Sequence, residues 1–141
     1  MKPILFAFGL SNENIFTTDF FGASDKFVIY EFSEGKSTKK EEVPNPFHRS
    51  SDKPGISEKR EIIVSLLQSR NVSVLVSRQF SKNLRLVNDL FIPVLIEKEN
   101  PEQVVEILEK NIKWIRDELK SRKSGHMLFR IKTGVLKLAI N

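Results

Sequence analysis

Near the start of the chain lies a continuous apolar run, Ile4-Leu5-Phe6-Ala7-Phe8. The run is too short for a stable helix and is rich in strand formers, so we predict a strand that is buried on both faces of a sheet. A signal peptide is the alternative, because a single Lys precedes the apolar run. The polar residues 11–14 that follow do not resemble a cleavage site, and this favours the strand.

The next segments predict two more strands. Residues 27–32 repeat the apolar, strand-forming character of the first run. Glu34-Gly35 is a turn signal, after which residues 36–43 are predicted to return as an antiparallel strand exposed on one face. Asn45-Pro46 ends this strand and a polar loop follows. The first third of the chain is therefore predicted to be a three-stranded meander.

Helices and strands then alternate. A first helix is predicted from an N-cap at Ser57, and apolar residues at helical spacing form its buried face: Ile62, Ile63, Leu66 and Leu67. The β-branched residues within 72–76 predict a strand.

A second helix is predicted over residues 82–90, with Leu90 or Phe91 pointing inward. The strand predicted over residues 92–96 contains Pro93, which places it at an edge of the sheet or at a strand start.

The clearest helix start is Asn100-Pro101-Glu102-Gln103, which combines an N-cap, a Pro in the first turn and the Gln of a capping box. Its predicted buried stripe continues through Val104, Val105, Ile107, Leu108, Ile112, Ile115 and Leu119. Beyond this helix, the apolar residues between 127 and 140 are compatible with a hairpin or with an amphipathic helix, because short apolar runs do not decide between them.

This order, β-β-β-α-β-α-β-α, predicts an α/β fold with a mixed five-stranded sheet, flanking helices and a C-terminal extension. We expect residues 1–112 to form the α/β domain. Residues 113–141, the end of the last helix and a basic extension, are expected to pack on the same domain.

Composition narrows the possible classes of protein. The chain has 141 residues, 40% of them hydrophobic, which suits one globular domain. It contains no Cys, which excludes disulfides and cysteine-ligated clusters and favours a cytoplasmic location. No apolar stretch approaches the ~20 residues of a membrane helix, so we expect no membrane association.

The net charge of +5 is unevenly distributed. From Lys113 onward the chain has eight basic and two acidic side chains, a net charge of +6, so the first 112 residues carry a net charge of −1. A general nucleic-acid surface is therefore not indicated.

The sequence lacks the usual signatures of catalysis. No nucleophile-elbow, P-loop or dinucleotide motif is present, which argues against a hydrolase or an NTPase. A two-metal nuclease would need an acidic residue in the middle of the first strand, where only apolar residues stand. His48 and His126 are too far apart in sequence for a local metal motif, and His126 is expected to have no ligand role.

Several segments together resemble a known family. They are Thr18-Asp19-Phe20-Phe21-Gly22-Ala23-Ser24-Asp25-Lys26-Phe27, then Val28-Ile29-Tyr30-Glu31, then Asn45-Pro46, and finally a helix followed by Val72-Ser73-Val74-Leu75-Val76. Over residues 1–112 the chain is similar to the dinitrogenase iron-molybdenum cofactor biosynthesis family, the small NifX-like and NifB C-terminal-like domains. The resemblance implies a ribonuclease H-like fold that carries a metal cluster.

One departure from the family pattern concerns the first loop. The family usually has His-Phe-Gly there, with the His as a cluster ligand, and this chain has Phe20 at the His position. The resemblance implies an iron-sulfur or iron-molybdenum type cluster as ligand. Because phenylalanine cannot coordinate metal and no Cys is present, we predict that the cluster is bound weakly or not at all, with His48 as the metal ligand.

We expect the ligand to lie among three loops, because ligands of open α/β sheets gather at the carboxyl ends of strands and helix amides suit an anion. The predicted cofactor-binding residues are Asp19, Phe21, Gly22, Asn45, His48, Arg49, Arg78, Lys82 and Asn83.

The predicted function is that of a non-enzymatic accessory or carrier protein for a metal cluster or its precursor, with a cluster-assembly protein as partner. The alternative is a degenerate binding module of the same fold that acts through protein or nucleic-acid contacts.

Overall fold

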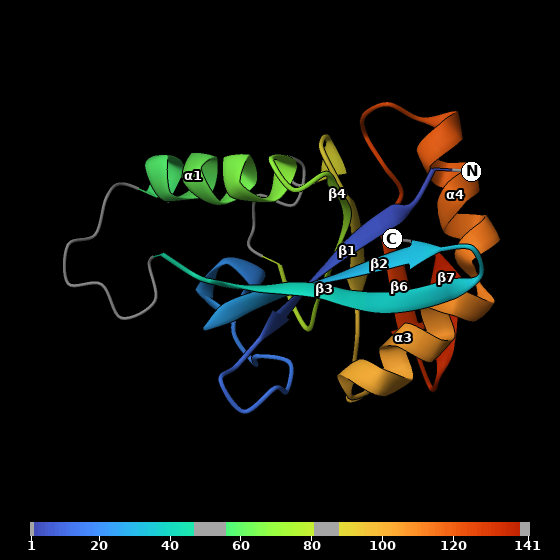
Figure 1. Cartoon of the computed structure of the whole chain (residues 1–141), viewed down its shortest axis with the longest axis horizontal. Coiled ribbons are helices and arrows are strands. Elements are labelled where there is room, and N and C mark those ends of the chain that lie inside the picture. The colour runs from blue at the N-terminus through green and yellow to red at the C-terminus, as the bar shows by residue number, and fades with distance from the viewer. Residues whose placement is uncertain (1, 47–55, 81–87, 139–141) are drawn as a thin grey trace.

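The computed structural model describes residues 2–46, 56–80 and 88–138. Its strands form one mixed sheet with helices on both faces (Figure 1). The strands are β1 (Ile4–Leu10), β2 (Lys26–Ser33), β3 (Lys36–Pro44), β4 (Val72–Ser77), β5 (Ile92–Leu95), β6 (Phe129–Lys132) and β7 (Val135–Leu138). The described helices are α1 (Ile56–Gln68), α3 (Pro101–Lys110), α4 (Ile112–Ser121) and the short 3₁₀ helix η1 (Phe21–Ala23).

The first strand is confirmed as a central strand. The strand order is β3-β2-β1-β4-β5-β6-β7, and β1 pairs antiparallel with β2 and parallel with β4. The side chains of β1 alternate between two apolar clusters: Phe6 and Phe8 face α3 and α4, whereas Ala7 faces α1. Burial on both faces accounts for the unbroken apolar run.

Most of the other expected elements are confirmed. The meander consists of β1, β2 and β3. β3 was expected to be exposed on one face, but its consecutive residues 38–42 are all exposed, so both faces are open to solvent there. The capping box is present: the side chain of Asn100 accepts a hydrogen bond from the backbone of Gln103 at 2.8 Å, and the Gln103 side chain accepts one from the backbone of Asn100 at 2.9 Å. Most of the predicted helix over residues 82–90 lies outside the described residues, but Phe91 is buried and Leu90 is exposed.

The predicted count of five strands is wrong, because the described sheet has seven. The C-terminal residues form a β6–β7 hairpin, and β6 pairs parallel with β5. This pairing excludes the edge position considered for Pro93, since β5 lies inside the sheet, whereas the alternative, a position near the start of a strand, agrees with the structure. Pro93 is the second residue of β5 and precedes the two residues that pair with β6, so its missing N–H interrupts no bond to β6.

Two predictions about helices are also wrong. The apolar residues predicted to line a single helix from Pro101 belong to two helices, α3 and α4, because the chain turns at Asn111. The side-chain amide of Asn111 donates a hydrogen bond to the Ile107 carbonyl at 2.8 Å. A side chain that bonds the local backbone competes with continuation of a helix. Ile62 was expected to be buried and is exposed, whereas Ile63 and Leu67 of the same helix are buried against the sheet.

Candidate functional site

The described parts of the loops that were predicted to bind the ligand share one edge of the sheet. β1 and β4 are parallel neighbours, so their carboxyl ends lie at the same edge. β2 is antiparallel to β1 and begins at this edge, and β3 ends there. The segment between β1 and β2, the residues after β3 and the residues after β4 are therefore brought together although they are far apart in sequence.

Gln79 joins the first and the third of these loops. Its backbone carbonyl accepts a hydrogen bond from the Phe21 N–H at 3.0 Å, and its side-chain amide donates to the Thr18 carbonyl at 2.6 Å. Ser77, at the end of β4, donates from its hydroxyl to the same Gln79 carbonyl at 3.0 Å. The loop after β4 is thus held against the loop that contains Asp19 and Gly22.

Asn45 joins the second loop to the first. Its side-chain amide donates to the carbonyls of Gly22 at 2.9 Å and Ser24 at 2.8 Å, and its backbone N–H donates to the Asp25 carbonyl at 3.1 Å. The side chain is buried, so these bonds are shielded from water. Asn45 fixes the position of the η1 turn relative to the end of β3.

The η1 turn packs closely on the sheet beneath it. Phe21 is buried and its ring stacks on Phe27 at a centroid distance of 4.9 Å and on Phe80 at 5.9 Å. Ser24 is fully buried, and its hydroxyl donates to the Phe21 carbonyl at 2.7 Å. A Cβ atom on Gly9 of β1 would lie 2.4 Å from the Ser24 Oγ, so only glycine allows this approach.

The predicted site residues occupy different positions in this arrangement. Asp19 and Arg78 are exposed, Gly22 is half-buried, and Phe21 and Asn45 are buried. Phe20, which the resemblance matches to a His of the family, is 42% exposed. The remaining predicted residues lie outside the described part of the chain: His48, Arg49, Lys82 and Asn83.

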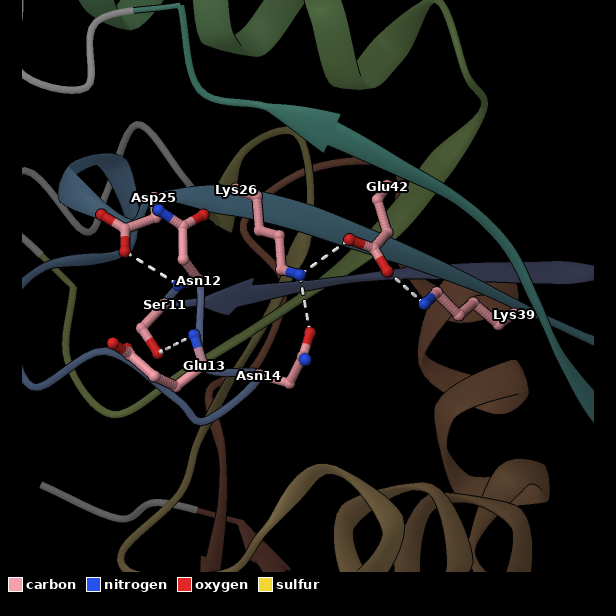
Figure 2. Close-up of polar contacts among 8 residues, drawn as sticks. All are labelled: Ser11, Asn12, Glu13, Asn14, Asp25, Lys26, Lys39 and Glu42. Atoms are coloured by element: carbon pink, nitrogen blue, oxygen red, sulfur yellow. Dashed lines mark hydrogen bonds and ion pairs between the residues drawn. The ribbon is translucent and has the colours of Figure 1, made fainter.

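A second polar cluster lies beside these loops, at the start of β2 (Figure 2). The Lys26 ammonium donates to Glu42 Oε1 at 2.7 Å and to Asn14 Oδ1 at 2.6 Å, and Lys39 pairs with the other oxygen of Glu42. Hydrogen bonds from Lys26 and Lys39 lower the pKa of the Glu42 carboxyl from 4.5 to about 2. Asp25 accepts a hydrogen bond from the Asn12 N–H at 2.8 Å, so the cluster ties the residues after β1 to β2 and β3.

His126 lies at the opposite edge of the sheet. It precedes β6, which runs parallel to β5, and its Nδ1 is 3.1 Å from Glu118 Oε2. Both side chains are about 5% exposed, and Arg122 donates to the other oxygen of Glu118 at 2.7 Å. His126 therefore has a partner within the protein, and it is remote from the three loops.

The described side chains do not form a complete metal site. Within residues 2–46, 56–80 and 88–138, no group of three or more His, Cys, Asp or Glu side chains is placed to hold a metal ion. The described helices include none long and apolar enough to cross a membrane.

Sequence reasoning missed several residues that shape this edge. Gln79 and Ser24 resemble ordinary polar loop residues, and their roles depend on which strands become neighbours. The glycine at position 9 is the only available signal, because a glycine inside an apolar strand often marks a close approach of another segment.

The fold and the joined loops define a small α/β protein with a loop cluster at the carboxyl edge of its parallel strands. A family model described as dinitrogenase iron-molybdenum cofactor matches residues 2–114. The chain therefore belongs to the dinitrogenase iron-molybdenum cofactor family, as the resemblance predicted. A comparison with curated proteins found no match.

Proposed function

We propose that this protein is a non-enzymatic accessory or carrier protein for an iron-sulfur or iron-molybdenum type cluster, or its precursor. The chain's membership of a family connected with the iron-molybdenum cofactor supports a metal cluster of this kind as the cargo. The proposed location of the cargo rests on one observation: hydrogen bonds from Gln79 and Asn45 join three loops at the carboxyl ends of β1 and β4. Ligands of open α/β sheets gather at this position.

The exposed residues of the joined loops suit an anionic cargo. Arg78 is exposed and makes no hydrogen bond or ion pair with another described residue, so its guanidinium is available to an external anion. Because His126 is buried beside Glu118, His48 is the imidazole that we assign as metal ligand. With so few ligands from this chain, the cargo is held weakly and is transferred readily to a cluster-assembly partner.

A degenerate binding module is the second candidate, and the exposed Phe20 ring favours it. An exposed aromatic side chain in place of a metal ligand is suited to contact with a protein, since aromatic residues are enriched in interface cores. In that case the loops keep their arrangement but bind a macromolecule.

Restoring the missing imidazole separates the two candidates. We expect Phe20→His to retain more iron and molybdenum than the unmodified chain after anaerobic reconstitution with iron, sulfide and molybdate. The matched control is Ile15→His, which adds an imidazole at another exposed apolar position on the same segment and should not raise metal content. His48→Ala should lower metal content. Equal metal content in all of these variants would favour the binding module.

The location of the cargo is tested by chemical-shift mapping with molybdate. We expect the backbone signals of Asp19, Gly22 and Arg78 to shift together. Shifts confined to residues 113–138 would contradict the proposed location.

A further inference from the structure

The β6–β7 hairpin lies beyond the family match to residues 2–114, and only one of its faces is needed for packing. Phe129, Ile131 and Leu136 are at most 3% exposed and join the apolar cluster beneath α3 and α4. The alternation of a strand then directs the intervening side chains to the other face. These are Arg130, Lys132, Val135 and Lys137, all exposed, which we call the basic ribbon.

The basic ribbon concentrates like charge on adjacent strands. Arg130 lies directly opposite Lys137, and Lys132 lies opposite Val135. Like charges at directly opposed positions destabilise a sheet. The charged side chains of Arg130, Lys132 and Lys137 make no hydrogen bond or ion pair with any other described residue. The nearest described carboxylate is that of Glu97, which accepts a hydrogen bond from the Thr133 N–H at 3.1 Å beside Lys132. No described acidic side chain pairs with Arg130 or Lys137, so an external anion would relieve the repulsion between these two opposed cations.

We propose that the basic ribbon is a docking surface for an acidic segment of a partner protein. Carboxylates of the partner would pair with the three cations. Val135, which is 51% exposed between them, would provide an apolar contact. Charge complementarity of this kind sets orientation and the rate of association more than final affinity, which suits a transient encounter.

The size and composition of the ribbon favour a protein over a nucleic acid. Each strand has four residues, and the ribbon contains no aromatic side chain on which a base could stack. Three cations would neutralise few phosphates, and the first 112 residues have a net charge of only −1. The other five basic residues after position 112 belong to α4 and the segment that follows it, and α4 covers the opposite face of the sheet.

The ribbon is separate from the joined loops at the carboxyl end of β1. In the sheet, β4 and β5 lie between β1 and β6, a separation of roughly 14 Å at the usual spacing of strands. Figure 1 shows α1 over the opposite half of the molecule from β6 and β7. A partner on the ribbon would therefore leave the joined loops accessible.

The proposal is tested by NMR titration of the full chain with a synthetic peptide of alternating Glu and Thr. We expect chemical shifts to change at residues 129–138. We also expect the affinity to fall about tenfold or more between ~50 and ~200 mM salt, as for contacts dominated by several charges. The triple substitution Arg130→Gln, Lys132→Gln and Lys137→Gln should abolish binding.

The matched control is Lys113→Gln, Lys120→Gln and Lys123→Gln, which removes the same charge from exposed positions outside the ribbon. This control should bind the peptide as the unmodified chain does. An equal loss in both triple variants, or unchanged binding after the ribbon substitutions, would overturn the proposal. Tighter binding of single-stranded DNA or of anionic phosphatidylserine vesicles at the ribbon would overturn the choice of partner.

A stability measurement tests the repulsion independently of binding. Arg130→Gln alone should raise the midpoint of thermal unfolding at low salt, because it removes one of two opposed cations. A lowered midpoint would show that the arrangement is not strained and would remove the basis of the proposal.

Discussion

Gly9 is the residue on which the close approach of the first loop to β1 depends. An added Cβ would lie 2.4 Å from Ser24 Oγ and 3.1 Å from Phe21 Cδ1. Because both neighbours are buried and held by the η1 turn, we expect Gly9→Ala to lower the free energy of unfolding by about 1–3 kcal/mol. Urea denaturation measures this change.

Gly22→Ala is the control for this substitution. The nearest atom to a Cβ at Gly22 is Ile63 Cδ1 at 3.8 Å, an ordinary contact, and its backbone φ is not in the left-handed region. We expect a change within about 0.5 kcal/mol. A loss equal to that of Gly9→Ala would show that the loop is sensitive to any added methyl group.

The pKa of Glu42 reports on the Lys26 cluster. The carboxylate is favoured in the folded protein, since its pKa falls from 4.5 to about 2. The interaction therefore contributes to stability above pH 4.5, and its contribution is lost as the pH falls from 4.5 towards 2. NMR titration of the Glu42 side chain should show this low pKa.

Lys26→Met should return the pKa of Glu42 towards 4.5, because the hydrogen bond from Lys26 is the largest cause of the shift. Lys40→Met is the comparison, since Lys40 pairs with Glu31 at 3.7 Å and not with Glu42. If Lys40→Met moved the pKa as far as Lys26→Met, general surface charge would be responsible in place of the direct bond.

At the scale of elements, α3 is held to the sheet by its apolar side chains. Leu108 is 1% exposed in the cluster beneath α3 and α4. We expect Leu108→Ala to lower the free energy of unfolding by about 2–5 kcal/mol, because it removes buried methyl groups and leaves a cavity. Glu106→Ala, on the exposed side of the same helix, should change stability by less than about 0.5 kcal/mol. An unchanged midpoint for Leu108→Ala would contradict the packing of α3.

At the scale of the whole molecule, the β6–β7 hairpin completes the sheet and covers its apolar cluster. A chain that ends at Ser124 would lack Phe129, Ile131 and Leu136 and would expose the edge of β5. Burial of each of these side chains contributes roughly 1.5–3 kcal/mol to the free energy of unfolding. We therefore expect a lower unfolding midpoint with no change in assembly state, measured by urea denaturation and sedimentation. Unchanged stability together with loss of a dimer would contradict this expectation.

Local pattern was sufficient to predict most elements of this protein. The two-sided burial of β1 follows from its unbroken apolar run, and the start of α3 follows from Asn100 and Gln103, because strand periodicity and capping involve residues close in sequence. The grouping of the three loops was also predicted, since the order of strands and helices indicates which strand ends share an edge. Their role in binding a cluster stays a prediction.

Other features depend on residues that are far apart in sequence. The apolar residues after Gly125 were compatible with a helix or a hairpin. The hairpin forms because the pairing of β6 with β5 buries Phe129 and Ile131. Of the two positions that the sequence allowed for Pro93, the same pairing excludes the edge of the sheet and leaves the start of a strand. Gln79 bonds to Thr18, and His126 to Glu118, only once distant strands and helices are in place. Local sequence could not specify these contacts, because their free energy comes from burial and hydrogen bonds that form only between elements already packed together.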